Sequence, residues 1–251
     1  MVDEDSNPAA PMTDAITIRD LPHGILREIL LQLDDAESVG VAAHSCREFY
    51  STFITIPRLV LEQYIPPSVL PYAYAVLKCE QEGLATASDE AKTHLLDIVY
   101  NGTTEFRAFF PDSELNWDTA SDASRFFEIV QRLSHRAANG AARAIRYEIP
   151  TVCRPGRVQL EDFVRSFEPD EFVLSEAETL RLHLVFYRNE LHFRLFSTTH
   201  GAQLSHDMEE DFFRRLQPWE TEQCMIVEDW MSRTIRKGES DRPLSILFIR
   251  S

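Results

Sequence analysis

The sequence predicts a mainly α-helical protein, with a small helical unit near its start and an irregular helical domain after it. Apolar residues recur mostly at helical spacing, whereas sustained alternation of apolar and polar residues is scarce. The chain is 44% apolar and 26% charged, as in ordinary folded proteins. We find no internal repeat with a period of about 20 to 50 residues, so solenoid and propeller folds are not supported.

Composition also narrows the classes of partner. The 251 residues include 41 acidic and 25 basic side chains, a formal net charge of −16, and this field repels the phosphate backbone of nucleic acids. No apolar run approaches the roughly 20 residues of a membrane span, so we expect neither nucleic acid nor a membrane as partner. Four widely spaced cysteines predict reduced core thiols in a cytoplasmic or nuclear protein: Cys46, Cys79, Cys153 and Cys224.

Residues 1–15 predict a flexible acidic tail. The segment has almost no large apolar residue, and it lacks the basic start and apolar centre of a secretory signal. Its acids and prolines are Asp3, Glu4, Asp5, Asp14, Pro8 and Pro11.

The stretch RDLPHGILREILLQL, residues 19–33, predicts the first helix. Pro22 suits the first turn of a helix, which then extends through Leu33. Five apolar residues at positions i, i+1, i+4, i+5 and i+8 form one wide apolar stripe on this helix: Ile25, Leu26, Ile29, Leu30 and Leu33.

Asp34 and Asp35 can end the first helix and cap a second one, predicted from Ala36 to about Tyr50. The second helix has an apolar surface of mostly small residues: Val39, Val41, Ala42, Ala43, Cys46 and Phe49. Two helices of this size cannot bury all of their apolar surface against each other. Either the rest of the chain or another protein covers the excess.

Helical spacing predicts further helices over residues 69–82, 85–100, 121–134, 160–167, 175–197, 205–216 and 219–237. Gly83 closes the first of these helices, and Asn139-Gly140 interrupts the chain before another helical piece that reaches Pro150. Residues 103–119 and 153–158 are predicted to be irregular. Residues 244–249 are ambiguous between a strand and a docked helical turn, and a chain that ends two residues later is also compatible with a truncated form.

Catalytic chemistry has weak support in the sequence. His200 and His206 precede the acids Asp207, Glu209, Glu210 and Asp211, but their spacing matches no metal site that we can name. An acidic helix start explains the same residues more simply. His183 and His192 are nine residues apart and do not share a helix face closely. No G-x-S-x-G motif, phosphate-binding loop or dinucleotide fingerprint occurs, so we predict no catalytic residue, no cofactor and no metal.

The aromatic residues at helical spacing predict a substantial core in the second part of the chain. Pro218 and Trp219 begin a helix whose first turn is acidified by Glu220 and Glu222. We expect Trp219 to be buried at this corner, because large aromatic side chains at helical spacing are usually core residues.

The order Leu21-Pro22, Ile25-Leu26-x-x-Ile29-Leu30-x-x-Leu33, an acidic corner and Cys46-Arg47-x-Phe49 resembles the F-box, the helical module by which substrate receptors bind the adaptor of SCF ubiquitin ligases. The resemblance covers about residues 16–61. It implies that the following residues bind the adaptor: Leu21, Pro22, Ile25, Leu26, Ile29, Leu30 and Leu33. The chain departs from the family where Asp35 replaces a common proline, where Ser38 and Gly40 replace larger residues, and where Pro57-Arg58-Leu59 lacks a tryptophan. These departures weaken the second helix and leave the first intact.

The resemblance implies a non-catalytic substrate receptor of an SCF-type ubiquitin ligase. Residues 16–61 would bind the adaptor and through it a cullin, and the helical domain over residues 62–251 would hold an unidentified target protein. The segment Leu216–Gln223 is also similar to a W-E-x-E segment of fungal proteins that begin with F-box-like sequences.

Two other hypotheses stay open at this point. The chain could be a self-contained helical scaffold, with no link to ubiquitin, whose N-terminal helices are sealed inside the fold. A metal-dependent enzyme around His200 and His206 is the third. Exposure of the Ile25, Leu26, Ile29 and Leu33 face distinguishes the first two.

Overall fold

The computed structural model describes residues 17–101, 110–111, 115–147, 173–196 and 206–236. Every regular element in these ranges is a helix, so the predicted mainly α-helical fold class is confirmed. Contacts divide the chain into two compact units, Met1–Ile56 and Pro57–Ser251. The division precedes helix α4 (Pro57–Tyr64), whereas the sequence placed the boundary between residues 61 and 62, inside that helix. No helix within the described ranges has the length and apolarity that crossing a membrane requires.

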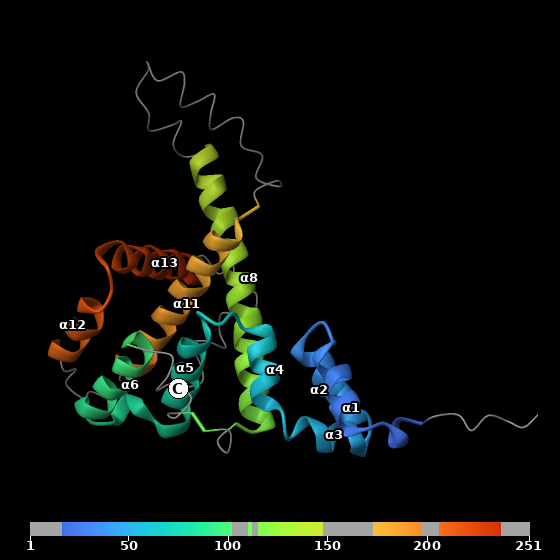
Figure 1. Cartoon of the computed structure of the whole chain (residues 1–251). Coiled ribbons are helices and arrows are strands. Elements are labelled where there is room, and N and C mark those ends of the chain that lie inside the picture. The colour runs from blue at the N-terminus through green and yellow to red at the C-terminus, as the bar shows by residue number, and fades with distance from the viewer. Residues whose placement is uncertain (1–16, 102–109, 112–114, 148–172, 197–205, 237–251) are drawn as a thin grey trace, which may run out of the picture. The chain divides into compact units, whose positions relative to one another are not determined.

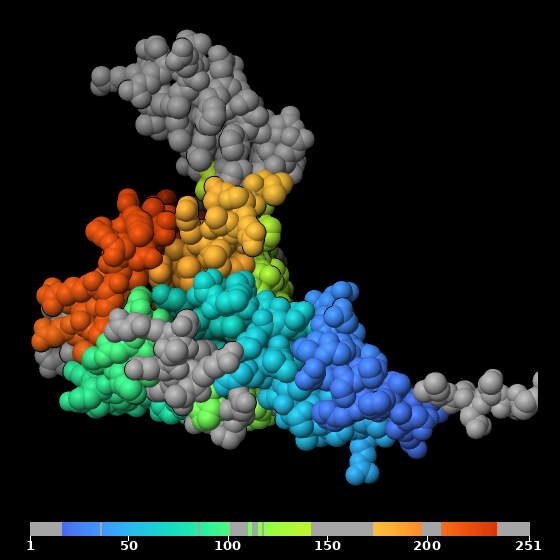
Figure 2. Space-filling model, in the orientation of Figure 1, coloured from blue at the N-terminus to red at the C-terminus, as the bar shows by residue number. Residues whose placement is uncertain are grey.

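The N-terminal unit contains a 3-10 turn and three α-helices, drawn in shades of blue in Figures 1 and 2. They are η1 (Ile18–Asp20), α1 (His23–Leu31), α2 (Ala36–Ser45) and α3 (Arg47–Phe53). The three α-helices contact one another and enclose a small core. The buried apolar residues of the unit are Leu26, Leu30, Val39, Ala43, Phe49, Phe53 and Ile56.

The single second helix predicted from Ala36 to about Tyr50 is wrong, because the chain breaks at Cys46. This residue has extended backbone angles, φ −154° and ψ 160°, and it ends α2 while capping α3. Its Sγ accepts a hydrogen bond from the backbone N–H of Phe49 at 3.5 Å. Because the break reorients the chain, α2 and α3 can each pack against α1.

Asp35 caps the start of α2, as the sequence predicts. Its Oδ1 accepts a hydrogen bond from the backbone N–H of Ser38 at 2.6 Å. This contact satisfies one of the N–H groups that a helix start leaves unpaired. The preceding helix α1 ends at Leu31 and not at Leu33.

The larger unit is built around helix α11. Figure 1 shows this helix among α5, α8 and α13, and it contacts each of them. The elements of the unit after α4 are α5 (Leu70–Glu82), η2 (Leu84–Thr86), α6 (Asp89–Asn101), α8 (Trp117–Tyr147), α11 (Glu176–Phe196), α12 (His206–Arg214) and α13 (Pro218–Arg236). One extensive apolar core runs through the unit.

Helix α5 is buried on all sides. Every residue from Tyr72 to Cys79 is buried, which in a helix includes all faces. Gly83 ends α5 in the left-handed conformation at φ 60°, as the sequence predicts, and its backbone N–H donates to the Cys79 carbonyl.

The interruption predicted at Asn139-Gly140 is wrong, because α8 is continuous from Trp117 to Tyr147. Gly140 lies where another helix comes close. A Cβ on Gly140 would lie 3.3 Å from Nε1 of Trp230, a residue of α13. The glycine therefore permits close approach of a side chain and does not stop the helix.

Several predicted features lie outside the described residues. They are the tail over residues 1–15, the irregular loop over 153–158, the helix over 160–167, the run over 244–249, and the single residues Cys153 and His200.

Candidate protein-binding surfaces

Helix α1 divides the predicted adaptor-binding residues between two faces. Leu26 and Leu30 are 4% and 0% exposed and belong to the core of the N-terminal unit. They are therefore unavailable to a partner while the unit is folded. The sequence pattern could not separate them from their neighbours, because adjacent apolar residues broaden the stripe in both directions.

The other predicted residues lie nearer the surface. Ile25 and Ile29 are 48% and 37% exposed, and they lie one turn apart on the same face of α1. Pro22 is exposed as well, while Leu21 and Leu33 are half-buried. The open apolar surface of α1 thus consists of Pro22, Ile25 and Ile29, with Leu21 and Leu33 at intermediate exposure.

The N-terminal unit exposes further large apolar side chains that the predicted set does not include: Ile18, Val41, Tyr50 and Ile54. Tyr50 and Ile54 come from α3 and the residue after it, one turn apart. Their i, i+4 spacing could have predicted a shared helix face after Cys46. The prediction of one helix that ends at about Tyr50 separated the two residues. The unit therefore has more apolar surface than its own core covers.

Charged groups of the N-terminal unit lie at its surface and form local contacts. Hydrogen bonds from Thr17 lower the pKa of the Asp20 carboxyl, and hydrogen bonds from Ser38 lower that of Asp35. Among the described residues up to Ile56, Thr52 is the only buried polar one, and its hydroxyl donates to the Glu48 carbonyl at 2.9 Å. The described part of this unit therefore has no buried charged side chain in its core.

In the larger unit, the prediction that Trp219 is buried is wrong, since its side chain is 50% exposed. The neighbouring Glu220 fixes this corner instead. Its Oε2 accepts from the backbone N–H of Gln217 at 2.8 Å, and its Oε1 accepts from Nη2 of Arg188 at 2.7 Å. Arg188 is buried, with its guanidinium 5.4 Å from the centre of the Tyr72 ring. Trp219 is left on the exposed surface of α13 with Met225 and Ile226.

The described thiols of the larger unit are poor nucleophiles. Burial raises the pKa of Cys79 to about 12 and that of Cys224 to about 11. Both thiols are therefore protonated at neutral pH, and the thiolate is the reactive form. Their place is in the apolar core.

Two acids at the start of α12 contact neighbouring side chains. Glu209 contacts Nε2 of His192 at 3.0 Å, and Glu210 contacts Arg214 at 2.7 Å within the same helix. His200 and the side chain of His206 lie outside what the structure describes. Within the described residues, no group of three or more His, Cys, Asp or Glu side chains could hold a metal ion.

We compared the chain with known proteins. No family model, curated protein or solved structure matches the chain. The candidate surfaces are therefore defined by the residues of this chain alone, with Ile25 and Ile29 in one unit and Trp219, Met225 and Ile226 in the other.

Proposed function

We propose that the protein is a non-catalytic substrate receptor of an SCF-type ubiquitin ligase, whose N-terminal unit binds the adaptor and through it a cullin. The observation that carries the proposal is the exposure of Ile25 and Ile29 on α1. Leu26 and Leu30 complete the core of the unit, so the two isoleucines are free to contact another protein.

The energetic argument rests on a few apolar residues. Full burial of one Leu or Ile contributes about 1.5 to 3 kcal/mol, and a few such residues usually dominate the affinity of an interface. The proposed adaptor contact is centred on Ile25 and Ile29, with Pro22, Leu21 and Leu33 around them. Leu26 and Leu30 act indirectly by holding α1 in place.

The resemblance to the F-box supports this assignment, and so does the three-helix form of the unit. One departure from the family pattern has a local explanation. Asp35 replaces a common proline but caps α2 through its contact with Ser38, so the second helix begins without that proline.

The larger unit is proposed to hold the target protein, while other subunits of the ligase transfer ubiquitin. Its exposed apolar residues on α13, Trp219, Met225 and Ile226, offer a surface for such a contact. No catalytic role is assigned to any residue of the chain.

The decisive experiment is a binding assay with purified SCF adaptor. The double substitution Ile25→Asp and Ile29→Asp should abolish co-purification, because two charges would enter an apolar contact. Since both side chains are exposed, the variant should keep its helical circular dichroism and its cooperative melting. Val41→Asp is the control for charge, because it replaces another exposed apolar residue of the unit, on α2, with one aspartate; Ile25→Asp and Ile29→Asp measured singly match it in charge.

Three outcomes would contradict the proposal. Wild-type protein that does not bind the adaptor would reject the F-box assignment. Adaptor binding that survives the double substitution would reject the contact residues. A double variant that unfolds, while wild type binds no adaptor, would favour the self-contained scaffold, in which these side chains are sealed inside the fold.

A further inference from the structure

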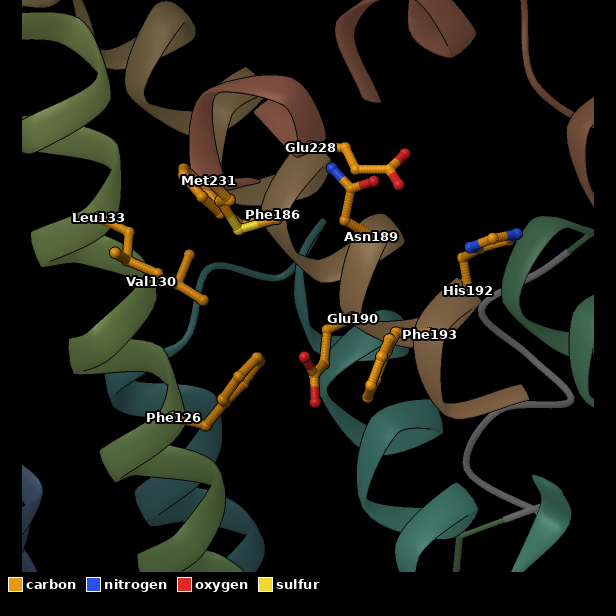
Figure 3. A pocket seen from close by; sticks show the side chains of 10 residues that line it. All are labelled: Phe126, Val130, Leu133, Phe186, Asn189, Glu190, His192, Phe193, Glu228 and Met231. Carbon is orange, nitrogen blue, oxygen red and sulfur yellow. The ribbon is translucent and has the colours of Figure 1, made fainter. Parts of the chain in front are cut away.

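A small cavity lies in the larger unit between α8, α11 and α13 (Figure 3). Its volume is about 80 Å³, and its walls include three aromatic rings, those of Phe126, Phe186 and Phe193. Sites for drug-sized ligands measure about 300 to 1,000 Å³. A cavity of this size can accept a single side chain or a short alkyl group.

One of the residues that line the cavity is a buried acid. Glu190 is 6% exposed, and Figure 3 shows its carboxylate between the rings of Phe126 and Phe193. Its Oε1 accepts from Nε of Arg194 at 2.6 Å, and Nη1 of the same arginine contacts Glu80 at 3.0 Å. In this cluster of three side chains, two carboxylates share one guanidinium. With both carboxyl groups ionised, the cluster has a net negative charge.

Two side chains of the lining that carry N–H groups already make a hydrogen bond elsewhere. Nδ2 of Asn189 donates to the backbone carbonyl of Cys224 at 3.2 Å, and Nε2 of His192 donates to Glu209 at 3.0 Å. The oxygens of Glu190, Glu228 and Asn189 provide acceptors in the same lining. A ligand that complements these groups must bring donors or positive charge.

We propose that this cavity binds a primary ammonium group on an alkyl stem, as presented by a lysine side chain of a partner protein. The methylene groups would lie against the aromatic rings, and the ammonium would approach the Glu190 carboxylate. Aromatic rings attract a cation through their negative faces. The formal net charge of −16 favours approach of a basic partner. This inference does not depend on adaptor binding by the N-terminal unit.

The test uses n-butylammonium as the probe and the methyl group of Met231, which lines the cavity, as the reporter. The full chain is labelled with methyl-¹³C methionine, and the resonance is assigned with Met231→Leu. Titration with n-butylammonium chloride should shift the Met231 resonance saturably, whereas sodium chloride at equal ionic strength should not. The neutral analogue n-butanol should bind at least about tenfold more weakly, because it lacks the charge.

Substitutions locate the site. Glu190→Gln should weaken n-butylammonium binding about tenfold by removing the central charge. Glu210→Gln is the matched control, because Glu210 also pairs with an arginine four residues later, on α12, and should leave binding unchanged. Val130→Phe fills the cavity without altering any charge and should abolish the shift.

The proposal fails if n-butylammonium causes no saturable shift, or if n-butanol binds equally well, which would indicate an apolar cavity without charge selection. Unchanged affinity in Glu190→Gln would also overturn it. Should Glu190→Gln lose cooperative melting, Val130→Phe decides the question: a shift that persists in this variant places the bound cation elsewhere.

Discussion

Helices α1 and α5 differ in how completely their apolar side chains are buried. In α1, Leu26 and Leu30 are buried while Ile25 and Ile29 remain open. In α5, every residue from Tyr72 to Cys79 is buried. The difference follows from size, because a small unit has neighbours for one face of a helix, whereas a larger unit can surround a helix completely.

Polar groups follow the same division. The ion pair between Arg27 and Glu28 in α1 lies at the surface, with both side chains about half exposed. In the larger unit, Arg188 is buried, and its Nη2 pairs with Oε1 of Glu220 on another helix at 2.7 Å. The pair between Arg27 and Glu28 should therefore contribute little to stability, whereas the pair between Arg188 and Glu220 should contribute more.

The largest expected effect separates the two faces of α1. Leu30→Ala should destabilise the N-terminal unit by about 2 to 5 kcal/mol, because it leaves a cavity in a small core. Ile29→Ala, one residue earlier, should cost less than about 1 kcal/mol, because part of that side chain is already in water. Denaturant unfolding followed by circular dichroism and by amide exchange of α1 measures both. Equal losses would contradict the division of α1 into a core face and an open face.

The second prediction compares an ion pair from each unit. Glu220→Ala should cost about 2 to 3 kcal/mol, because it leaves the buried guanidinium of Arg188 without its carboxylate and removes a contact at the start of α13. Glu28→Ala should change stability by less than about 0.5 kcal/mol. Thermal and urea unfolding of the two variants test this. A neutral Glu220→Ala would show that Arg188 finds another partner or water.

The third prediction is that the contributions of Asp35 and Glu190 to stability change with pH in opposite directions. Hydrogen bonds from Ser38 hold the pKa of Asp35 below its ordinary 3.8, so its stabilising contribution is present above pH 3.8 and is lost as pH falls through the lowered value. Burial raises the pKa of Glu190 above its ordinary 4.5, an effect that Arg194 partly offsets. Ionisation of Glu190 therefore lowers the free energy of unfolding progressively as pH rises from 4.5 through the raised value.

Unfolding free energies between pH 2 and pH 8, measured for wild type, Asp35→Asn and Glu190→Gln, would separate these contributions. Relative to wild type, Glu190→Gln should gain stability as the pH rises above 4.5, the ordinary glutamate value. In Asp35→Asn, the free energy of unfolding should lack the part of the wild-type fall with decreasing pH that comes from protonation of Asp35. The same pH dependence in both variants would contradict the contrast between the units.

The smallest expected effect concerns the corner of α13. Trp219→Ala should cost about 1 kcal/mol or less, because half of the side chain is already in water. A fully buried tryptophan would cost about 3 to 5 kcal/mol. Melting of this variant beside Glu220→Ala tests which of the two neighbouring residues holds the corner, and a larger loss for Trp219→Ala would reverse the assignment.

Local rules in the sequence were sufficient for much of the fold. Helical spacing predicted the fold class, and capping chemistry located Asp35 before α2 and Gly83 after α5. These features depend on interactions within a few residues, which a single sequence records directly. The apolar character of α1 was likewise evident.

Tertiary packing decided the rest, because the same local pattern fits more than one environment. Asn139-Gly140 is a pair that often ends a helix, yet Gly140 lies inside α8, where Trp230 comes close. The apolar stripe of α1 did not reveal that Leu26 and Leu30 would be buried while Ile25 and Ile29 stay open. Trp219, which was expected to be buried, is exposed, and Glu220 holds the corner because a buried arginine from α11 pairs with it. Which side chain is buried depends on distant segments, and their contacts exist only once the chain has folded.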